Sequence, residues 1–182
     1  MNQSKPFHEL TLTDDFMFGC VMSTKEICKT FLESLLSISI REMSFPEVQK
    51  VLKDAPDYHG QRLDIFVRDV DGNAYNIEMQ NRQEDDLLRR ARVYGAAIDR
   101  KMLESGQNYA ELPDTVVIFV NDFDFFKEGL AVYRVRKSID EPEWNTRVEY
   151  NDGLHFIFLN THFTKENTVV SKKTNFPKLN LR

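Results

Sequence analysis

Two runs of alternating apolar and polar residues lie close together near the middle of the chain. Residues 62–69 read RLDIFVRD and residues 74–80 read AYNIEMQ, so each run alternates with a period of two. This alternation is typical of strands that turn one face toward a core. The Asp71-Gly72 pair between them is a turn dipeptide, and the two runs therefore predict a β-hairpin.

Helical spacing of apolar residues appears on both sides of this hairpin. Within residues 10–38, candidate caps at Thr13 or Asp14 and at Ser23 or Thr24 each precede apolar positions at helical spacing, which predicts two helices. A longer helix is expected after residue 81 and before Gly106. Its apolar stripe consists of Leu87, Ala91, Tyr94, Ile98 and Met102.

The other side of this predicted helix is basic. Arg89, Arg92 and Arg100 fall opposite the apolar stripe at about 100° per residue. A solvated helix face is the default interpretation, and a strip that binds phosphate is the alternative.

Short apolar runs predict the remaining strands. Residues 115–120, 130–137 and 154–160 each read as a strand, and residues 45–52 read as a weak one interrupted by Pro46. The stretch around Pro142 is rich in turn residues. Strands mixed with helices in this order predict an α/β domain.

Composition limits the class of protein. The chain has 182 residues, a length that fits one domain, and 41% of them are hydrophobic, which is enough for a buried core. Its net charge is −5. We expect a flexible leader at residues 1–9, the domain at 10–161 and a poorly ordered tail at 162–182. No apolar run is long enough for a membrane span, and two cysteines without metal-ligand spacing exclude a zinc cage. A reduced, cytoplasmic protein with no membrane partner is expected.

The candidate chemistry lies on the hairpin. Asp64, Glu78 and Gln80 interrupt apolar residues in mid-strand, where carboxylates have poor β-propensity. Two neighbouring carboxylates repel each other unless a cation neutralises them. Mg²⁺ needs only one or two protein carboxylates, and it can activate water and stabilise charge on a phosphodiester. A half-exposed hairpin with a polar outer face is the alternative, and the residues alone do not separate the two.

The register of the hairpin tests this hypothesis. In an antiparallel pair, the numbers of opposed residues have a constant sum. A two-residue loop at 71–72 gives a sum of 143 and places Asp64 and Glu78 on opposite faces. A three-residue loop at 71–73 gives 144. In that register Asp64 faces Gln80, and Glu78 is its diagonal neighbour on the same face. A shared carboxylate site requires an even sum or a bulge.

Five segments of the chain resemble a known family when they are taken in order. They are LTDDFMFGCVM (12–22), LDIFV (63–67), GNAYNIEMQ (72–80), the RAxxY pattern (90–94) and GQNYAELPDTVVIFVNDFDFF (106–126). From about Leu10 to Thr161, this text resembles the PD-(D/E)XK nuclease family transposases, also described as recombination-promoting nucleases.

The resemblance implies a fold and a metal site. The fold is a restriction-endonuclease-like α/β core, with a mixed central sheet flanked by helices and the acidic site on a β-hairpin. By motif, Asp64 and Glu78 are the metal ligands, with Mg²⁺ (or Mn²⁺ or Ca²⁺) as the cofactor. Gln80 completes the catalytic set, at the position where wider PD-(D/E)XK nucleases have a lysine.

Three further residues are implied as supporting groups. Asp15, in the family's opening DxxF helix, is a candidate outer carboxylate. Arg90 and Tyr94 match the family's helix signature and are candidates to orient the site or to contact phosphate. A salt bridge at the edge of the core is the alternative for Arg90.

The resemblance thus predicts a metal-dependent DNA endonuclease that acts in recombination or in mobile elements. The Pro56-Asp57 pair mimics the motif but lies in a loop, so Asp57 ranks below Asp64. The tail at 162–182 has no resemblance that we find, which indicates a truncated or frameshifted copy. A nuclease-dead remnant that binds DNA or protein is therefore one alternative, and an acidic interaction protein is another. Salt-dependent DNA binding distinguishes this last alternative from the other two.

Overall fold

The structure is a computed structural model that describes residues 9–52 and 61–165. The Pro56-Asp57 loop, most of the predicted leader and most of the predicted tail lie outside these residues. Within them, no helix is both long and apolar enough to cross a membrane.

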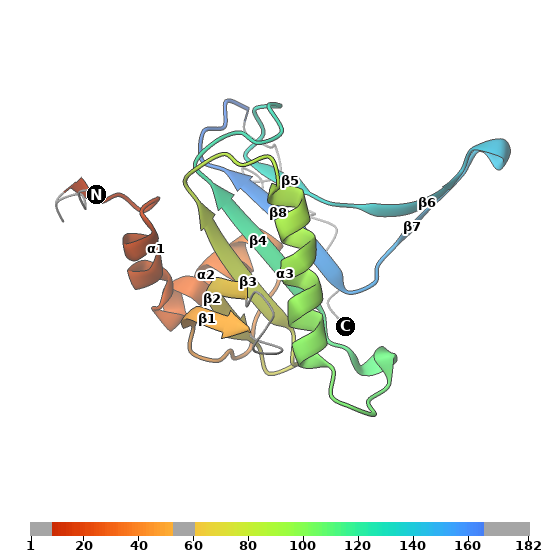
Figure 1. The fold of residues 1–182 in the computed structure, drawn as a ribbon, viewed down its shortest axis with the longest axis horizontal. Coiled ribbons are helices and arrows are strands. Elements are labelled where there is room, and N and C mark those ends of the chain that lie inside the picture. The colour runs from red at the N-terminus through yellow and green to blue at the C-terminus, as the bar shows by residue number, and fades with distance from the viewer. Residues whose placement is uncertain (1–8, 53–60, 166–182) are drawn as a thin grey trace.

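A mixed sheet of six strands forms the centre of the molecule (Figure 1). In spatial order the strands are β1 (Glu47–Leu52), β2 (Gln61–Arg68), β3 (Ala74–Gln80), β4 (Thr115–Asn121), β8 (Leu154–Asn160) and β5 (Val132–Arg134). The middle strands β3, β4 and β8 are parallel, and the pairs at both edges of the sheet are antiparallel.

Helices cover both faces of this sheet. They are α1 (Asp15–Met22), α2 (Lys25–Leu36) and α3 (Leu87–Met102). Buried residues of α1 and α2 share one core with the sheet, and buried residues of α3 share a second core with the opposite face. The predicted α/β class, with a mixed sheet flanked by helices, is confirmed and is consistent with a restriction-endonuclease-like fold.

Helix α3 packs on the hairpin and buries the face that the sequence predicted to be exposed. The sequence predicted one apolar and one polar face, but every residue of β3 is buried. The predicted helix stripe explains this burial, because Leu87, Ala91 and Ile98 pack against the second face of the sheet. The polar residues on that face of β3 therefore lie under a helix.

The alternation of residues 62–69 predicts that Leu63, Ile65 and Val67 share one face of β2, and this prediction is wrong for Leu63. Ile65 and Val67 belong to the core beneath α1 and α2, as predicted, but Leu63 belongs to the core beneath α3. The pleat of β2 thus changes face at Asp64. The neighbouring strand β1 is irregular at the same level. Gln49 has a left-handed backbone with φ of 54°, and it lies between the pairs Val48–Ile65 and Lys50–Leu63.

The register of the β2–β3 hairpin is even. Ile65 pairs with Ile77, so the index sum is 142, and the requirement for a shared carboxylate face is confirmed. The predicted sum of 144 is wrong, because the three-residue loop begins one residue earlier, at Val70. The Asp69 carboxylate fixes this turn by accepting hydrogen bonds from the main-chain nitrogens of Asp71 and Asn73, at 3.0 and 2.9 Å.

A second, two-stranded sheet was missed by the sequence analysis. It comprises β6 (Lys137–Glu141) and β7 (Thr146–Tyr150), joined by the 3₁₀ turn η3 (Pro142–Trp144). The predicted strand at 130–137 is split between β5 and β6. Figure 1 shows this arm projecting from the body of the molecule. Its cross-strand pair Ile139–Val148 is 63% and 53% exposed, so no core imposes the alternation that reveals a strand in sequence.

Candidate functional site

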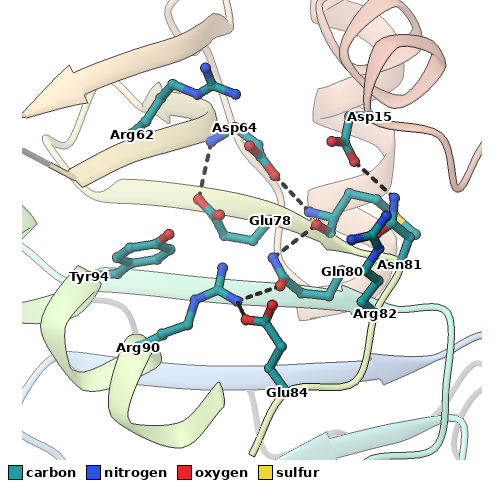
Figure 2. A pocket seen from close by; sticks show the side chains of 11 residues that line it. Asp15, Arg62, Asp64, Glu78, Gln80, Asn81, Arg82, Glu84, Arg90 and Tyr94 are labelled. Carbon is teal, nitrogen blue, oxygen red and sulfur yellow. Dashed lines mark hydrogen bonds and ion pairs between the residues drawn. The ribbon is translucent and has the colours of Figure 1, made fainter. Parts of the chain in front are cut away.

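The carboxylates of Asp64 and Glu78 exchange hydrogen bonds with each other's strands (Figure 2). The ladder between β2 and β3 ends at Ile65–Ile77, immediately before these two residues. Beyond it, Glu78 Oε1 accepts a hydrogen bond from the Asp64 nitrogen at 3.1 Å, and Asp64 Oδ2 accepts one from the Met79 nitrogen at 3.0 Å. One oxygen of each carboxylate is thereby fixed by main chain.

The other oxygen of each carboxylate faces a cleft. Neither Asp64 Oδ1 nor Glu78 Oε2 has a hydrogen-bond partner among the residues that the structure describes. Both side chains line an open cleft of about 350 Å³. Its lining residues are Asp15, Arg62, Asp64, Glu78, Met79, Gln80, Asn81, Arg82, Glu84, Arg90 and Tyr94. All six side chains predicted as site residues therefore meet in one cleft.

Burial makes the pair of carboxylates hard to ionise together. Burial, and secondarily the charge of Asp64, raise the pKa of Glu78 to about 8. Burial also raises the pKa of Asp64, and the charge of Asp15 adds to this, although the hydrogen bond from Met79 lowers it. Without a cation, the pair therefore holds a proton at neutral pH.

The stability of the metal-free protein should depend on pH for this reason. The folded state holds the proton of Glu78 more tightly than the unfolded chain, in which a glutamate has its ordinary pKa of 4.5. This stabilisation is therefore complete below pH 4.5 and is lost as pH rises through about 8. In EDTA, we expect the free energy of unfolding to fall by about 3 kcal/mol between pH 5.5 and 8.5. Urea titrations of the native protein and Glu78→Gln measure this, and the variant should lose most of the dependence. An equal dependence in both proteins would assign it to other groups.

Gln80 and Arg90 form a second, linked pair. Arg90 Nη1 donates to Gln80 Oε1 at 2.8 Å and to Glu84 Oε2 at 3.2 Å. Gln80 Nε2 donates to the Met79 carbonyl at 2.9 Å. Because a guanidinium only donates hydrogen bonds, the contact to Arg90 fixes which end of the amide is the oxygen. Both polar groups of Gln80 are therefore engaged within the protein.

The two residues of the family's helix signature, Arg90 and Tyr94, contact each other. They are one turn apart on α3, and the Arg90 guanidinium lies 5.9 Å from the centre of the Tyr94 ring. Burial raises the pKa of Tyr94, with the charge of Glu78 as the next cause. Helix α3 thus contributes one cation and one neutral phenol to the wall beside Glu78.

Asp15 reaches the cleft from α1. Its Oδ1 accepts a hydrogen bond from Asn81 Nδ2 at 3.4 Å, and its charge acts on Asp64. The sequence reasoning missed Arg62, Arg82, Asn81 and Glu84. Alternation along residues 62–69 puts Arg62 on the same strand face as Asp64, and this pattern is the sequence signal that could have identified Arg62.

The donor set fits a hard divalent cation. Across residues 9–52 and 61–165, no three histidine, cysteine, aspartate or glutamate side chains are grouped as a complete metal site. Mg²⁺, however, commonly takes one or two protein carboxylates and completes its octahedron with water and substrate phosphate. The oxygens of Asp64 and Glu78 that face the cleft, which have no partner among the described residues, match that requirement.

The basic face of α3 lies outside the cleft. Arg89, Arg92 and Arg100 are exposed, and none of them lines the cleft with Arg90. Their arrangement as a solvated face is therefore observed, and a role in phosphate binding stays a prediction.

Comparison with known protein families identifies the family of this chain. A family model described as PD-(D/E)XK nuclease family transposase matches residues 13–179. The chain belongs to this family. As a PD-(D/E)XK nuclease family transposase, it has a nuclease- or transposase-related role, which implies DNA as the substrate. The match continues past Thr161, where the motifs compared above end. No curated protein and no solved structure matches the chain.

Proposed function

We propose that this chain is a divalent-metal-dependent DNA endonuclease that hydrolyses phosphodiester bonds during recombination or in mobile elements. The observation that carries the proposal is the crossed pairing of Asp64 and Glu78. It holds two carboxylates on one face with an oxygen of each turned toward the cleft. Family membership supports the reaction class.

Each residue of the cleft has a proposed part. Asp64 and Glu78 would hold Mg²⁺, which when bound lowers the pKa of water and stabilises charge on phosphate oxygens. Arg62 and Arg82 add positive charge to the cleft wall, where they would attract the DNA backbone.

Gln80 acts through Arg90 in this proposal. A neutral amide cannot supply the positive charge of the lysine found at this position in wider PD-(D/E)XK nucleases. The side-chain oxygen of Gln80 accepts a hydrogen bond from Arg90 Nη1 at 2.8 Å. The guanidinium of Arg90 therefore brings a positive charge from α3 to the position of Gln80. The alternative is that Gln80 itself orients water or phosphate. The hydrogen bonds favour a role in orienting Arg90 instead.

Truncating Arg90 to alanine should lower the cleavage rate by about 10²-fold, because a preorganised donor in an active site contributes on that scale. Arg89→Ala is the matched control, since its side chain is the exposed neighbour on the same helix. The measurement is the initial rate of plasmid nicking in saturating Mg²⁺. Equal rates for the two variants would remove Arg90 from the site.

The experiment that tests the proposed function is nicking of supercoiled plasmid in Mg²⁺, in Mn²⁺ and in EDTA. We expect cleavage in either metal, none in EDTA, and recovery when excess Mg²⁺ is added back. A folded protein that nicks in neither metal would refute the proposal. In that case, DNA binding that weakens steeply with salt would support the nuclease-dead remnant, and no such binding would support the acidic interaction protein.

A further inference from the structure

One buried amide interrupts an apolar row of the sheet. The row crosses four strands and contains Phe66, Asn76, Val117 and Phe156, in register. Asn76 is fully buried, and α3 covers this face of the sheet. A buried amide in apolar surroundings lowers stability unless its polar atoms are paired. An apolar residue would suit this position better for folding alone.

Only half of this amide is satisfied. Asn76 Nδ2 donates to Glu78 Oε1 at 2.9 Å. Asn76 Oδ1 is buried and has no hydrogen-bond partner among the residues that the structure describes. A group retained for stability would be expected to have both ends paired. The one hydrogen bond of the side chain is to the carboxylate proposed as a metal ligand.

Two donors therefore meet on one oxygen of Glu78. The Asp64 nitrogen lies at 3.1 Å from Oε1 and Asn76 Nδ2 at 2.9 Å, and the two come from different strands. Together they limit rotation of the carboxylate and leave Oε2 as the oxygen that faces the cleft. Without Asn76, a single main-chain donor would remain, and the carboxylate would have to be ordered when a cation binds.

We propose that Asn76 is a positioning residue that fixes the Glu78 carboxylate for metal binding. Its neutral amide can orient Glu78 without bringing a positive charge that would compete with the cation. The inference rests on the proposed function, because it takes Glu78 as a metal ligand. It goes beyond that function by assigning a role to a residue that does not line the cleft.

The test compares metal affinity with stability in one variant. Asn76→Leu keeps a similar side-chain volume and removes both the donor and the unpartnered acceptor. Mn²⁺ is the probe, titrated without DNA and followed by the electron paramagnetic resonance signal of free Mn²⁺. We expect the Kd for Mn²⁺ to rise about 10- to 100-fold, as for other residues that orient metal ligands. We expect the urea midpoint in EDTA to stay equal or to increase, because an unpaired buried acceptor is removed.

Asn73→Leu is the matched control. Asn73 is also buried and lies just before the other end of β3, but both ends of its amide are paired, with Asp69 Oδ2 at 2.9 Å and the Asp114 nitrogen at 3.2 Å. This variant should therefore show the opposite behaviour, with a lower urea midpoint and unchanged Mn²⁺ affinity. Asn76→Ala serves as a second variant, because it removes the same donor without adding a branched side chain. The same rise in Kd is expected for it.

The outcomes separate this inference from the proposed function. If the native protein binds Mn²⁺ more tightly than Asp64→Asn does, but the Asn76 variants bind it like the native protein, the positioning role is wrong and the metal site stands. If the native protein binds Mn²⁺ no better than Asp64→Asn, the proposed function itself fails. If Asn73→Leu weakens Mn²⁺ binding as much as the Asn76 variants do, the positioning role is also overturned, because the loss of affinity would then reflect a general loss of structure.

Discussion

Replacing Asp64 by asparagine should lower the rate of Mg²⁺-dependent plasmid cleavage by about 10³-fold. The asparagine oxygen can still accept the hydrogen bond from the Met79 nitrogen, so the hairpin should keep its shape. What the variant loses is the negative charge that, in our proposal, holds the cation. Metal ions contribute several kcal/mol to such reactions, and each 1.36 kcal/mol is a factor of ten in rate.

Asp71→Asn is the matched control for this prediction. It makes the same substitution in the turn of the same hairpin, where the Asp71 carboxylate pairs at 2.8 Å with the exposed Arg41. Cleavage by this variant should equal that of the native protein. If Asp64→Asn cleaves as fast as Asp71→Asn in identically purified samples, the active site does not lie on the hairpin.

The sequence was informative about this site because the hairpin is local. Alternation identified both strands, and it isolated Asp64 and Glu78 as carboxylates that packing does not explain. The register could not be read from the turn dipeptide, because the Asp69 side chain shifts the loop by one residue. As a result Asp64 lies level with Glu78 rather than with Gln80.

Contacts that depend on packing between elements could not be predicted. The hydrogen bond from Arg90 to Gln80 requires α3 to lie across β3, and the apolar periodicity of the helix alone does not fix that placement. The apolar stripe of α3 showed that the helix has a buried side, but not which strand it covers. The two strands of the arm were missed for the opposite reason, because their paired apolar residues Ile139 and Val148 are exposed and do not belong to either core among the described residues.

The same packing sets the chemistry of the site. Helix α3 covers the face of β3 that carries Glu78, and this burial is the main reason that the pKa of Glu78 is raised. A fully exposed hairpin with the same two carboxylates would ionise both and bind a cation with less specific geometry. We therefore expect core residues beneath α3 to affect both stability and the site.

Phe119→Ala should have the largest effect on stability among such residues. Phe119 is fully buried next to Glu78 in register, and its ring stacks against Tyr94 at 6.1 Å and Phe158 at 5.5 Å between centroids. Its removal leaves a cavity between the sheet and α3. We expect the free energy of unfolding, measured by urea titration in EDTA, to fall by about 3–5 kcal/mol.

Phe45→Ala provides the control for this measurement, because it deletes the same atoms at a position that is 75% exposed. Its free energy of unfolding should stay within about 0.5 kcal/mol of the native value. If Phe119→Ala is equally mild, α3 does not pack on β4 as the structure shows. The burial that raises the pKa of Glu78 would then need another cause, since α3 is the element that separates this face of the sheet from water.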